Sequence, residues 1–451
     1  MNRLYKIKLE NIKNVRAGSI CFFDGNKCLN LTGIYGPNGS GKTTFVQTIS
    51  FIQHIVFNGI SNSDFSNFRN YLEIFTNLAN GFNNEISSIE ITLRNEKGDF
   101  IFSTHFTVRN DRIEIIEESM KFRSNKKYSR VVELFHYNKY VTNANNSLPI
   151  SNLRKSESKK INKKSNLIEL LVIAKMVNQD GGSFIFNSEF FNFLEKSNIF
   201  KNELLEGINI FRNFCLDLII VDSQISGSIY TELFLPIGYA VDNSRGFVSL
   251  QIDNEDKIYT EQIVNAKKVI EQINKVLPIL VPKLTISLKV KEFQDKEGKF
   301  TNIVVMGERG GHRYPLKAES DGIKKIISIL SVLINVYNNP NATVIIDELD
   351  AGIYEYLLGE IISTISEGGK GLLIFISHNL RPLEVIDYNK VIFTTLNEKN
   401  RYIRVKIDSN ENLRDAYIRL MQLGGAQEPL FIPVTDSKIR RAFRKAKDRE
   451  Y

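Results

Sequence analysis

The sequence predicts an α/β fold in which a parallel sheet is split by a large mixed α+β insertion. Three short apolar runs have the composition of strands that are buried on both faces; they lie at 29–35, 343–346 and 372–376. Stretches with helical spacing of apolar residues lie beside them, at 44–57, 320–337 and 353–365. Because most of the chain separates the first strand from the other two, the sheet must combine two distant lobes.

Composition restricts the class of protein. The chain has 451 residues, enough for two or three domains, and its contents of 42% hydrophobic and 24% charged residues are typical of a soluble globular protein. No apolar run is long enough to span a membrane, and three scattered cysteines favour a reducing cytoplasm. The net charge of +8 is compatible with a nucleic-acid or acidic partner, and equally with a lysine-rich proteome.

The first element with chemical meaning is a glycine-rich turn between a predicted strand and a predicted helix. Its sequence is Gly36-Pro37-Asn38-Gly39-Ser40-Gly41-Lys42-Thr43, followed by Thr44, and it fits the phosphate-binding pattern G-x-x-x-x-G-K-[ST]. The helix start supplies amide donors for phosphate. We expect Lys42 to reach the β- and γ-phosphates of ATP and the Thr43 hydroxyl to ligate Mg²⁺. The alternative is a glycine-rich turn without a ligand.

The middle of the chain reads as mixed structure. Alternating apolar residues over 86–122 predict an antiparallel meander. The run from Arg154 to Lys164 is basic, and we interpret it as a solvated loop in preference to a nucleic-acid patch. Helices are predicted at 167–176, 188–194, 203–213 and 259–276, the last ended by Pro278. Strands are predicted within 225–250 and 286–305.

Two predicted strands of the C-terminal lobe end in polar residues. The first, Val344 to Ile346, is followed by Asp347 and Glu348; we expect Asp347 to bind Mg²⁺ through water and Glu348 to polarise the attacking water. The next strand delivers His378 to the carboxyl edge of the sheet, where ligands bind in open α/β folds. His378 would contact the γ-phosphate or order the attacking water.

A helix begins just before the acid strand, at Ser320-Asp321-Gly322. Ser320 suits a simple N-cap. Its hydroxyl and the helix amides also suit a phosphate. The glycine-rich turn already binds the phosphates of the nucleotide in its own subunit. We therefore expect this helix start to bind the nucleotide of a partner subunit.

These four segments, in this order, resemble the ABC-type ATPases of the SMC/RecF kind. The segments YKIKLENIKNV, GIYGPNGSGKTTF, PLKAESDGIKKI, VIIDELDAGIYEYLL and GLLIFISHN are most similar to the bacterial AAA15 and overcoming-lysogenization-defect ATPases. The resemblance implies a P-loop NTPase with an ABC-ATPase head, ATP and Mg²⁺ as cofactors, and slow regulatory hydrolysis. It also implies a homodimer or higher homo-oligomer around sandwiched ATP.

The same resemblance implies a biological role and a division of the chain. Such ATPases commonly act with a separate effector, a nuclease or toxin, in anti-phage defence systems of the PARIS or Septu kind. The expected parts are an N-terminal lobe (1–85), an insertion (86–312), a C-terminal lobe (313–425) and a basic tail (426–451). The tail, rich in lysine and arginine from Lys438 to Arg449, suits either a nucleic acid or acidic partner or a solvated terminus.

The chain also departs from its apparent relatives. Glu319 to Gly322 replaces the Leu-Ser-Gly-Gly of transporters, which disfavours a transporter subunit, and Tyr354 stands where many relatives have histidine. No glutamine-loop residue can be assigned, since Gln47 and Gln53 lie in the first helix and Gln224 in the insertion. No Asp-x-Asp pair follows His378, so we expect no nuclease of its own. The alternative function is a RecF- or SMC-like ATPase that binds DNA in repair or maintenance.

Overall fold

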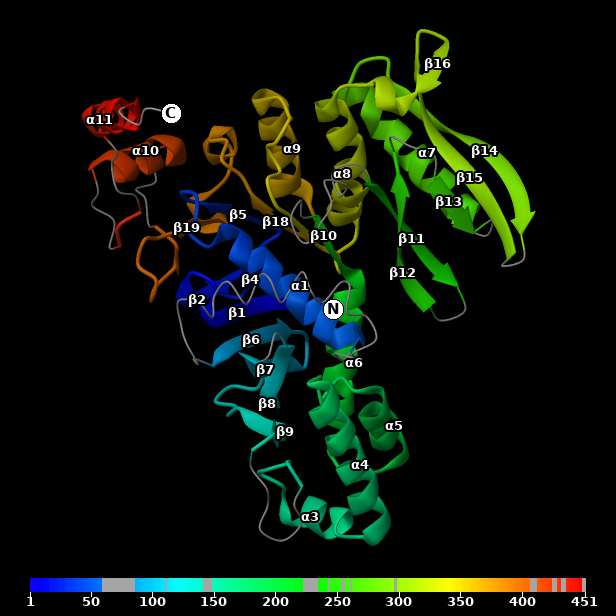
Figure 1. Ribbon diagram of the computed structural model, residues 1–451, viewed down its shortest axis with the longest axis vertical. Coiled ribbons are helices and arrows are strands. Elements are labelled where there is room, and N and C mark those ends of the chain that lie inside the picture. The colour runs from blue at the N-terminus through cyan, green and yellow to red at the C-terminus, as the bar shows by residue number, and fades with distance from the viewer. Residues whose placement is uncertain are drawn as a thin grey trace.

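The computed structural model describes most of the chain (Figure 1). The described residues are 1–58, 86–109, 112–140, 148–221, 234–241, 244–252, 256–259, 262–295, 298–405, 412–423, 428–430 and 435–447. Gln224 and Arg449, both considered above, lie outside them. Among the described helices none is long and apolar enough to span a membrane.

The central element is a six-stranded sheet with the strand order β10-β17-β18-β5-β19-β20. The strands are β10 (Leu218–Val221), β17 (Thr343–Ile346), β18 (Leu372–Ile376), β5 (Leu31–Tyr35), β19 (Val391–Thr394) and β20 (Tyr402–Ile403). All neighbours pair in parallel except β19 and β20. Every residue of β5, β17, β18 and β19 is buried, which explains their apolar runs. The α/β fold with distant lobes is therefore confirmed.

Helices cover both faces of this sheet. Alternate side chains of the strands enter two separate cores, so that Ile345 packs with α1 (Lys42–Asn58) and Val344 packs with α8 (Asp321–Asn338) and α9 (Glu355–Gly368). All three helices were predicted from their spacing. The arrangement brings the N-terminus of α1 to the carboxyl edge of the sheet, where β17 and β18 also end.

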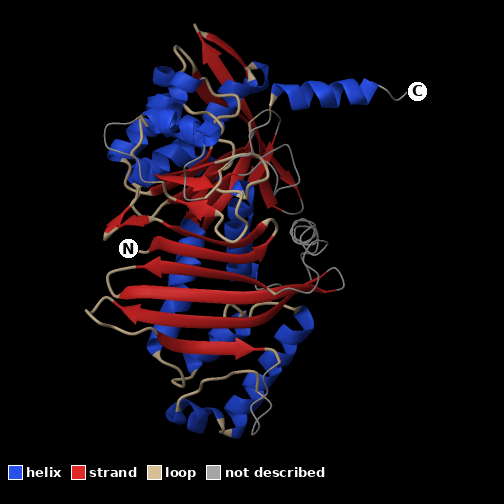
Figure 2. Ribbon diagram, turned by 90° about the vertical axis from the view of Figure 1, so that its left-hand side faces the viewer, coloured by secondary structure: helices blue, strands red, loops and turns tan. Residues whose placement is uncertain are grey.

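A second six-stranded sheet is antiparallel, with the order β2-β1-β6-β7-β8-β9. Its strands are β1 (Arg3–Ile12), β2 (Val15–Cys21), β6 (Ser87–Arg94), β7 (Gly98–Arg109), β8 (Arg112–Ser124) and β9 (Val132–Asn138). Figure 2 shows its open face, with helices behind it. The predicted meander is confirmed. We expected the N-terminal lobe to end at residue 85 and the insertion to begin at residue 86. Because β1 of the lobe pairs directly with β6 of the insertion, however, the two parts share this one sheet.

A helical arm follows the meander, at the bottom of Figure 1. It contains α3 (Lys155–Ile161), α4 (Lys164–Asp180), α5 (Ser188–Lys196) and α6 (Asn202–Asp217). The basic run is thus helical, and its interpretation as a loop was wrong. Glu157 and Ile161, four residues apart, are buried, while the lysines between them face solvent. The carboxylate of Glu157 also accepts a hydrogen bond of 2.9 Å from the amide of Arg154 at the helix start.

The insertion does not stay outside the central sheet. Strand β10 follows α6 without an intervening loop and pairs with β17. The expected insertion at 86–312 therefore contributes an edge strand to the sheet that carries the glycine-rich turn. This pairing involves residues far apart in sequence, and the short run Leu218–Val221 gave no local sign of it.

A third region contains a hairpin and a small sheet beside a long helix. Its elements are β11 (Phe234–Val241), β12 (Ser244–Gln251), β13 (Asp256–Tyr259), α7 (Ile263–Leu280), β14 (Thr285–Asp295), β15 (Gly298–Arg309) and β16 (His312–Pro315). Pro278 does not end α7 as expected. The helix continues to Leu280, and the amide of Val281 still donates to the carbonyl of Leu277 at 2.8 Å.

The remaining elements are short or terminal. Two-residue strands β3 (Phe23–Asp24) and β4 (Lys27–Cys28) form a small hairpin, and 3₁₀ turns occupy Leu316–Ala318, Arg381–Glu384 and Tyr388–Lys390. The chain continues through α10 (Leu413–Leu423) to α11 (Asp436–Lys447). In Figure 2, α11 extends away from the rest of the molecule. The helical character predicted for the basic tail is confirmed over these residues.

Candidate nucleotide site

The glycine-rich turn connects β5 to α1 at the carboxyl edge of the central sheet. Gly39 and Gly41 have φ of +72° and +93°, values that favour glycine, and no atom lies within 4 Å of the position of a Cβ on Gly39. Ser40 is buried and its hydroxyl donates 2.6 Å to the carbonyl of Pro37, while Asn38 is exposed. The turn is thus an open cradle of backbone amides at a helix N-terminus, which suits phosphate.

Lys42 lies inside this cradle with only 6% of its surface exposed. Its amine donates to the carbonyls of Gly36 and Pro37, at 2.8 and 2.9 Å. Burial lowers the pKa of Lys42, while the nearby carboxylates of Asp347 and Asp350 oppose that shift. A cation held at a helix start by neutral carbonyls is well placed to exchange them for phosphate oxygens.

Asp347 brings the C-terminal lobe to the turn. Its carboxylate lies beside the hydroxyl of Thr43 and accepts a hydrogen bond of 3.0 Å from the amide of Glu348. Burial raises the pKa of Asp347, and the Thr43 hydroxyl opposes this rise. A hydroxyl and a carboxylate in contact are an oxygen pair of the kind that Mg²⁺ prefers. The residues present therefore fit Mg²⁺ with a nucleotide.

Glu348 follows in a strained backbone conformation. Its φ is +50°, which non-glycine residues adopt only where the surroundings enforce it. Its carbonyl accepts a hydrogen bond of 2.7 Å from the amine of Lys325 in α8. Such strain is common at functional residues. It sets Glu348 beside Asp347 at the sheet edge, close enough for its charge to act on Lys42.

His378 lies where the sequence predicted, at the end of β18. Its side chain is exposed, and its backbone amide donates 3.1 Å to the carboxylate of Asp350. The same carboxylate oxygen accepts from the amide of Asn379 at 3.0 Å. Asp350 therefore ties the loop after β17 to the end of β18, which holds Glu348 and His378 at one edge.

The helix start at Ser320 to Gly322 lies beside the loop that follows Glu348. A Cβ on Gly322 would lie 2.2 Å from the carbonyl oxygen of Gly352, so only glycine allows this contact. Ser320 is the N-cap of α8 by backbone conformation, but its exposed hydroxyl caps no amide, and Asp321 is exposed. Among the described residues, no hydrogen bond joins this helix start to the glycine-rich turn. The carboxylate of Asp321 forms an ion pair of 2.7 Å with Lys324, while the Ser320 hydroxyl is exposed to other molecules.

The match to known families decides where the chain belongs. Residues 6–303, more than half of the chain, match a family model described as AAA domain. The chain belongs to the AAA domain family. A search of curated proteins found no match to this AAA domain.

Several solved structures are similar to this AAA domain at low sequence identity. An Smc head domain with a coiled coil and joint from Pyrococcus yayanosii has 11% identity and a TM-score of 0.43, with 93% of this chain and 99% of that chain covered. An Smc head domain with an extended coiled coil, bound to the C-terminal domain of ScpA and derived from Pyrococcus furiosus, has 13% identity and a TM-score of 0.42. The match covers 93% of this chain and 99% of that chain. The SMC head domain from Thermotoga maritima has 14% identity and a TM-score of 0.33, with 90% of this chain and 100% of that chain covered.

Sequence reasoning missed two residues that hold the glycine-rich turn of this AAA domain. Asn14, in the turn between β1 and β2, donates to the carbonyl of Gly39 and accepts 3.1 Å from the hydroxyl of Thr44. Arg401 donates to the carbonyl of Asn14 and, at 2.6 Å, to that of Thr395. Neither belongs to a local motif. Gln47, considered for the glutamine loop, instead accepts a hydrogen bond from Lys13.

Proposed function

We propose that this protein binds ATP with Mg²⁺ and hydrolyses it at the edge formed by β5, β17 and β18. The observation that carries the proposal is the approach of Asp347, an acid from the other end of the chain, to Thr43 and Lys42 of the phosphate-binding turn. Lys42 is buried in the same cluster, where the charges of Asp347, Asp350 and Glu348 act on it. Membership of the AAA domain family supports ATP as the substrate.

Each residue has a chemical task in this proposal. Lys42 stabilises charge on the β- and γ-phosphates, and the amides of the turn donate to their oxygens. Thr43 and Asp347 hold Mg²⁺, which would neutralise phosphate charge during transfer. Glu348 accepts a proton from the attacking water, and His378 orders that water or contacts the γ-phosphate. Turnover is slow and regulatory.

ATP binding and phosphate release test this proposal directly. Lys42→Ala should lose most ATP affinity and all turnover, because the cation that offsets phosphate charge is gone. Lys317→Ala, which removes an exposed lysine at the start of the C-terminal lobe, is the matched control and should behave as the unaltered chain. If the Lys42→Ala protein hydrolyses ATP at a near-normal rate, the site is assigned wrongly.

We further propose that two copies sandwich ATP, in the manner of ABC-type heads. The support is the start of α8, where the Ser320 hydroxyl caps no amide and the helix dipole faces outward. A two-fold arrangement gives two equivalent composite sites, each with Lys42 from one copy and Ser320 from the other. ATP would then convert monomers to a homodimer, and light scattering with and without ATP measures this.

Regulation of a separate effector, a nuclease or toxin, in anti-phage defence is the role that we propose for the ATP-bound dimer. This part of the proposal rests on the resemblance to AAA15-type ATPases and on the lack of an Asp-x-Asp pair after His378. Co-purification with the product of a neighbouring gene, dependent on ATP, would support it. If no product of a neighbouring gene co-purifies with this protein in an ATP-dependent manner, that result would count against it.

A DNA-binding ATPase of the RecF or SMC kind is the second candidate, and α11 favours it. This helix is exposed and carries lysine and arginine along its surface, namely Lys438, Arg440, Arg441, Arg444 and Lys445. Phosphate contacts make binding fall steeply as salt rises. A steep salt dependence of duplex binding that disappears on removal of α11 would favour this function over effector control.

A further inference from the structure

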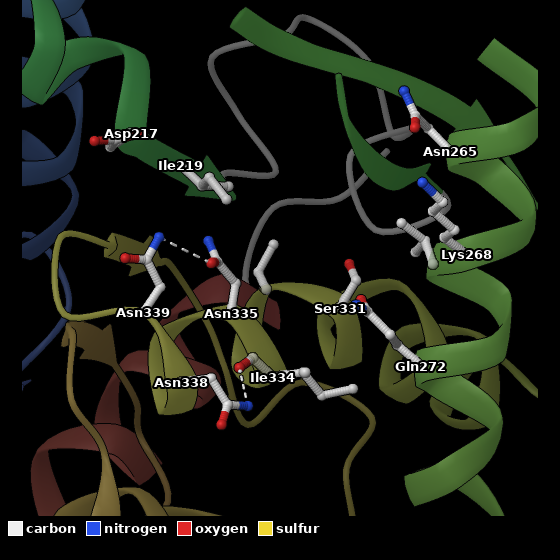
Figure 3. A pocket seen from close by; sticks show the side chains of 12 residues that line it. Asp217, Ile219, Asn265, Lys268, Gln272, Ser331, Ile334, Asn335, Asn338 and Asn339 are labelled. Carbon is white, nitrogen blue, oxygen red and sulfur yellow. Dashed lines mark hydrogen bonds between the residues drawn. The ribbon is translucent and has the colours of Figure 1, made fainter. Parts of the chain in front are cut away.

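A groove between α7, α8 and the start of β10 lies outside the nucleotide site. It encloses about 560 Å³, within the range of small-molecule sites, roughly 300–1,000 Å³. Figure 3 shows side chains from α7 and α8 entering it from two sides. None of its lining residues belongs to the glycine-rich turn, to the acid loop or to the start of α8.

The lining is polar on both helices. On α7, the residues Asn265, Lys268 and Gln272 are spaced three and four apart and share one face of the helix. On α8, Ser331 and Asn335 are four residues apart and face them across the groove (Figure 3). Two packed helices usually meet through apolar stripes, so facing polar stripes indicate a purpose other than packing.

The amide oxygen of Asn335 accepts a hydrogen bond of 3.3 Å from Asn339, but the other four polar side chains are not paired with one another. The hydroxyl oxygen of Ser331 is shielded from solvent and has no hydrogen-bond partner within the described part of the chain. The side chains of Asn265, Lys268 and Gln272 make no hydrogen bond or ion pair with any described residue. A shielded hydroxyl without a partner is costly unless a water or a ligand completes it.

The combination of side chains indicates the chemistry of a ligand. A carboxamide presents a donor and an acceptor side by side, which matches the edge of a nucleobase. The amine of Lys268 is a point charge that suits a phosphate. Val332, which is buried beside the groove, adds an apolar residue to its lining. We propose that this groove binds a mononucleotide, with its base read by the amides of Asn265 and Gln272 and its phosphate by Lys268.

Titration of the full-length protein with AMP, GMP, CMP and UMP, followed by calorimetry, tests the proposal. At least one of them should bind saturably at one site per chain. Lys268→Ala should weaken that binding by about tenfold or more, as expected when one charge-assisted hydrogen bond is lost. Lys267→Ala is the matched control, because Lys267 is exposed on the same helix but does not line the groove.

Ribose 5-phosphate separates base recognition from phosphate binding, since it carries the phosphate without a base. It should bind at least about tenfold more weakly than the preferred mononucleotide. The proposal is overturned if none of the four mononucleotides binds saturably at millimolar concentration. It is overturned equally if Lys268→Ala has no more effect than Lys267→Ala, which would place binding elsewhere, or if ribose 5-phosphate binds as tightly as the nucleotides.

Discussion

The amine of Lys325, buried in α8, donates a hydrogen bond of 2.7 Å to the backbone carbonyl of Glu348. Glu348 holds a left-handed backbone conformation, with φ of +50°. The helix that begins at Ser320 is thus joined to the acid proposed as the general base. Through this contact, a partner that engages the start of α8 would also act on the position of Glu348.

Lys325→Met should slow ATP hydrolysis by about tenfold while ATP affinity changes little, because a hydrogen bond of roughly 1.5–3 kcal/mol no longer holds Glu348. Methionine keeps the length and the apolar stem of the side chain, so α8 should stay folded. Steady-state kinetics measure kcat and KM separately. A change confined to KM, or none at all, would contradict a positioning role for Lys325.

The two neighbouring acids should fail in different ways. Glu348→Gln should retain ATP binding and slow hydrolysis by roughly a hundredfold, within the range for loss of a general base. Asp347→Asn should instead weaken binding that depends on Mg²⁺, because the carboxylate beside Thr43 loses its charge. Nucleotide binding with Mg²⁺ and with EDTA distinguishes them. Equal and mild effects in both variants would argue against separate roles.

Glu118 should make the stability of the protein depend on pH. Burial raises the pKa of its carboxyl to about 7, although the Ser183 hydroxyl and the amides of Phe184 and Ile185 donate to it. Because the folded pKa lies above the ordinary 4.5, the stabilisation is complete below pH 4.5 and is lost as pH rises toward 7.

The corresponding measurement is the unfolding of the unaltered chain and of Glu118→Gln across that pH range. The unaltered chain should lose stability by up to about 1.4 kcal/mol per pH unit relative to Glu118→Gln. Parallel stability curves for the two proteins would show that Glu118 does not titrate in this range. Glutamine retains a carbonyl that can accept from the same amides, so the variant isolates the charge.

The site was predictable where its chemistry is local in sequence. The turn from Gly36 to Thr43 and the strand that ends in Asp347 each contain their own pattern of apolar and polar residues. Their contact through Thr43 then follows from the rule that parallel strands end at one edge. Asn14 and Arg401 could not be found in this way, because they act through hydrogen bonds to backbone atoms and carry no motif.

The fold was less predictable where long-range pairing decided it. Strand β10 is four residues long and belongs to the central sheet only because β17 is available beside it. Pro278 was taken as a helix end, although α7 lacks only the one hydrogen bond that Pro278 cannot donate and continues to Leu280. The lysines around Glu157 obscured the spacing of Glu157 and Ile161, which marks the buried side of α3.

The purified protein should show ATPase activity and no metal-dependent cleavage of DNA or RNA. This expectation rests on the sequence after His378, which contains no Asp-x-Asp pair. Incubation with labelled DNA and RNA in Mg²⁺ and Mn²⁺ checks this. Robust cleavage that a substitution in this chain abolishes would overturn control of a separate effector.

The composite site is the central claim, and mixed subunits test it most directly. Ser320→Arg alone should leave ATP binding by the monomer nearly intact but block ATP-dependent association and hydrolysis, because bulk and charge fill the place of the partner's γ-phosphate. Lys42→Ala alone should also be inactive. In a dimer of the two variants, one site carries both lesions and the other carries neither.

ATPase activity of the mixture, measured together with the formation of mixed dimers, is therefore the decisive measurement. We predict that mixing two inactive proteins restores activity, because Ser320 of one copy completes the site that contains Lys42 of the other. If mixed dimers form and no activity returns, the independent composite sites that we propose are contradicted. A Ser320→Arg protein that dimerises normally on ATP would contradict the sandwich arrangement itself.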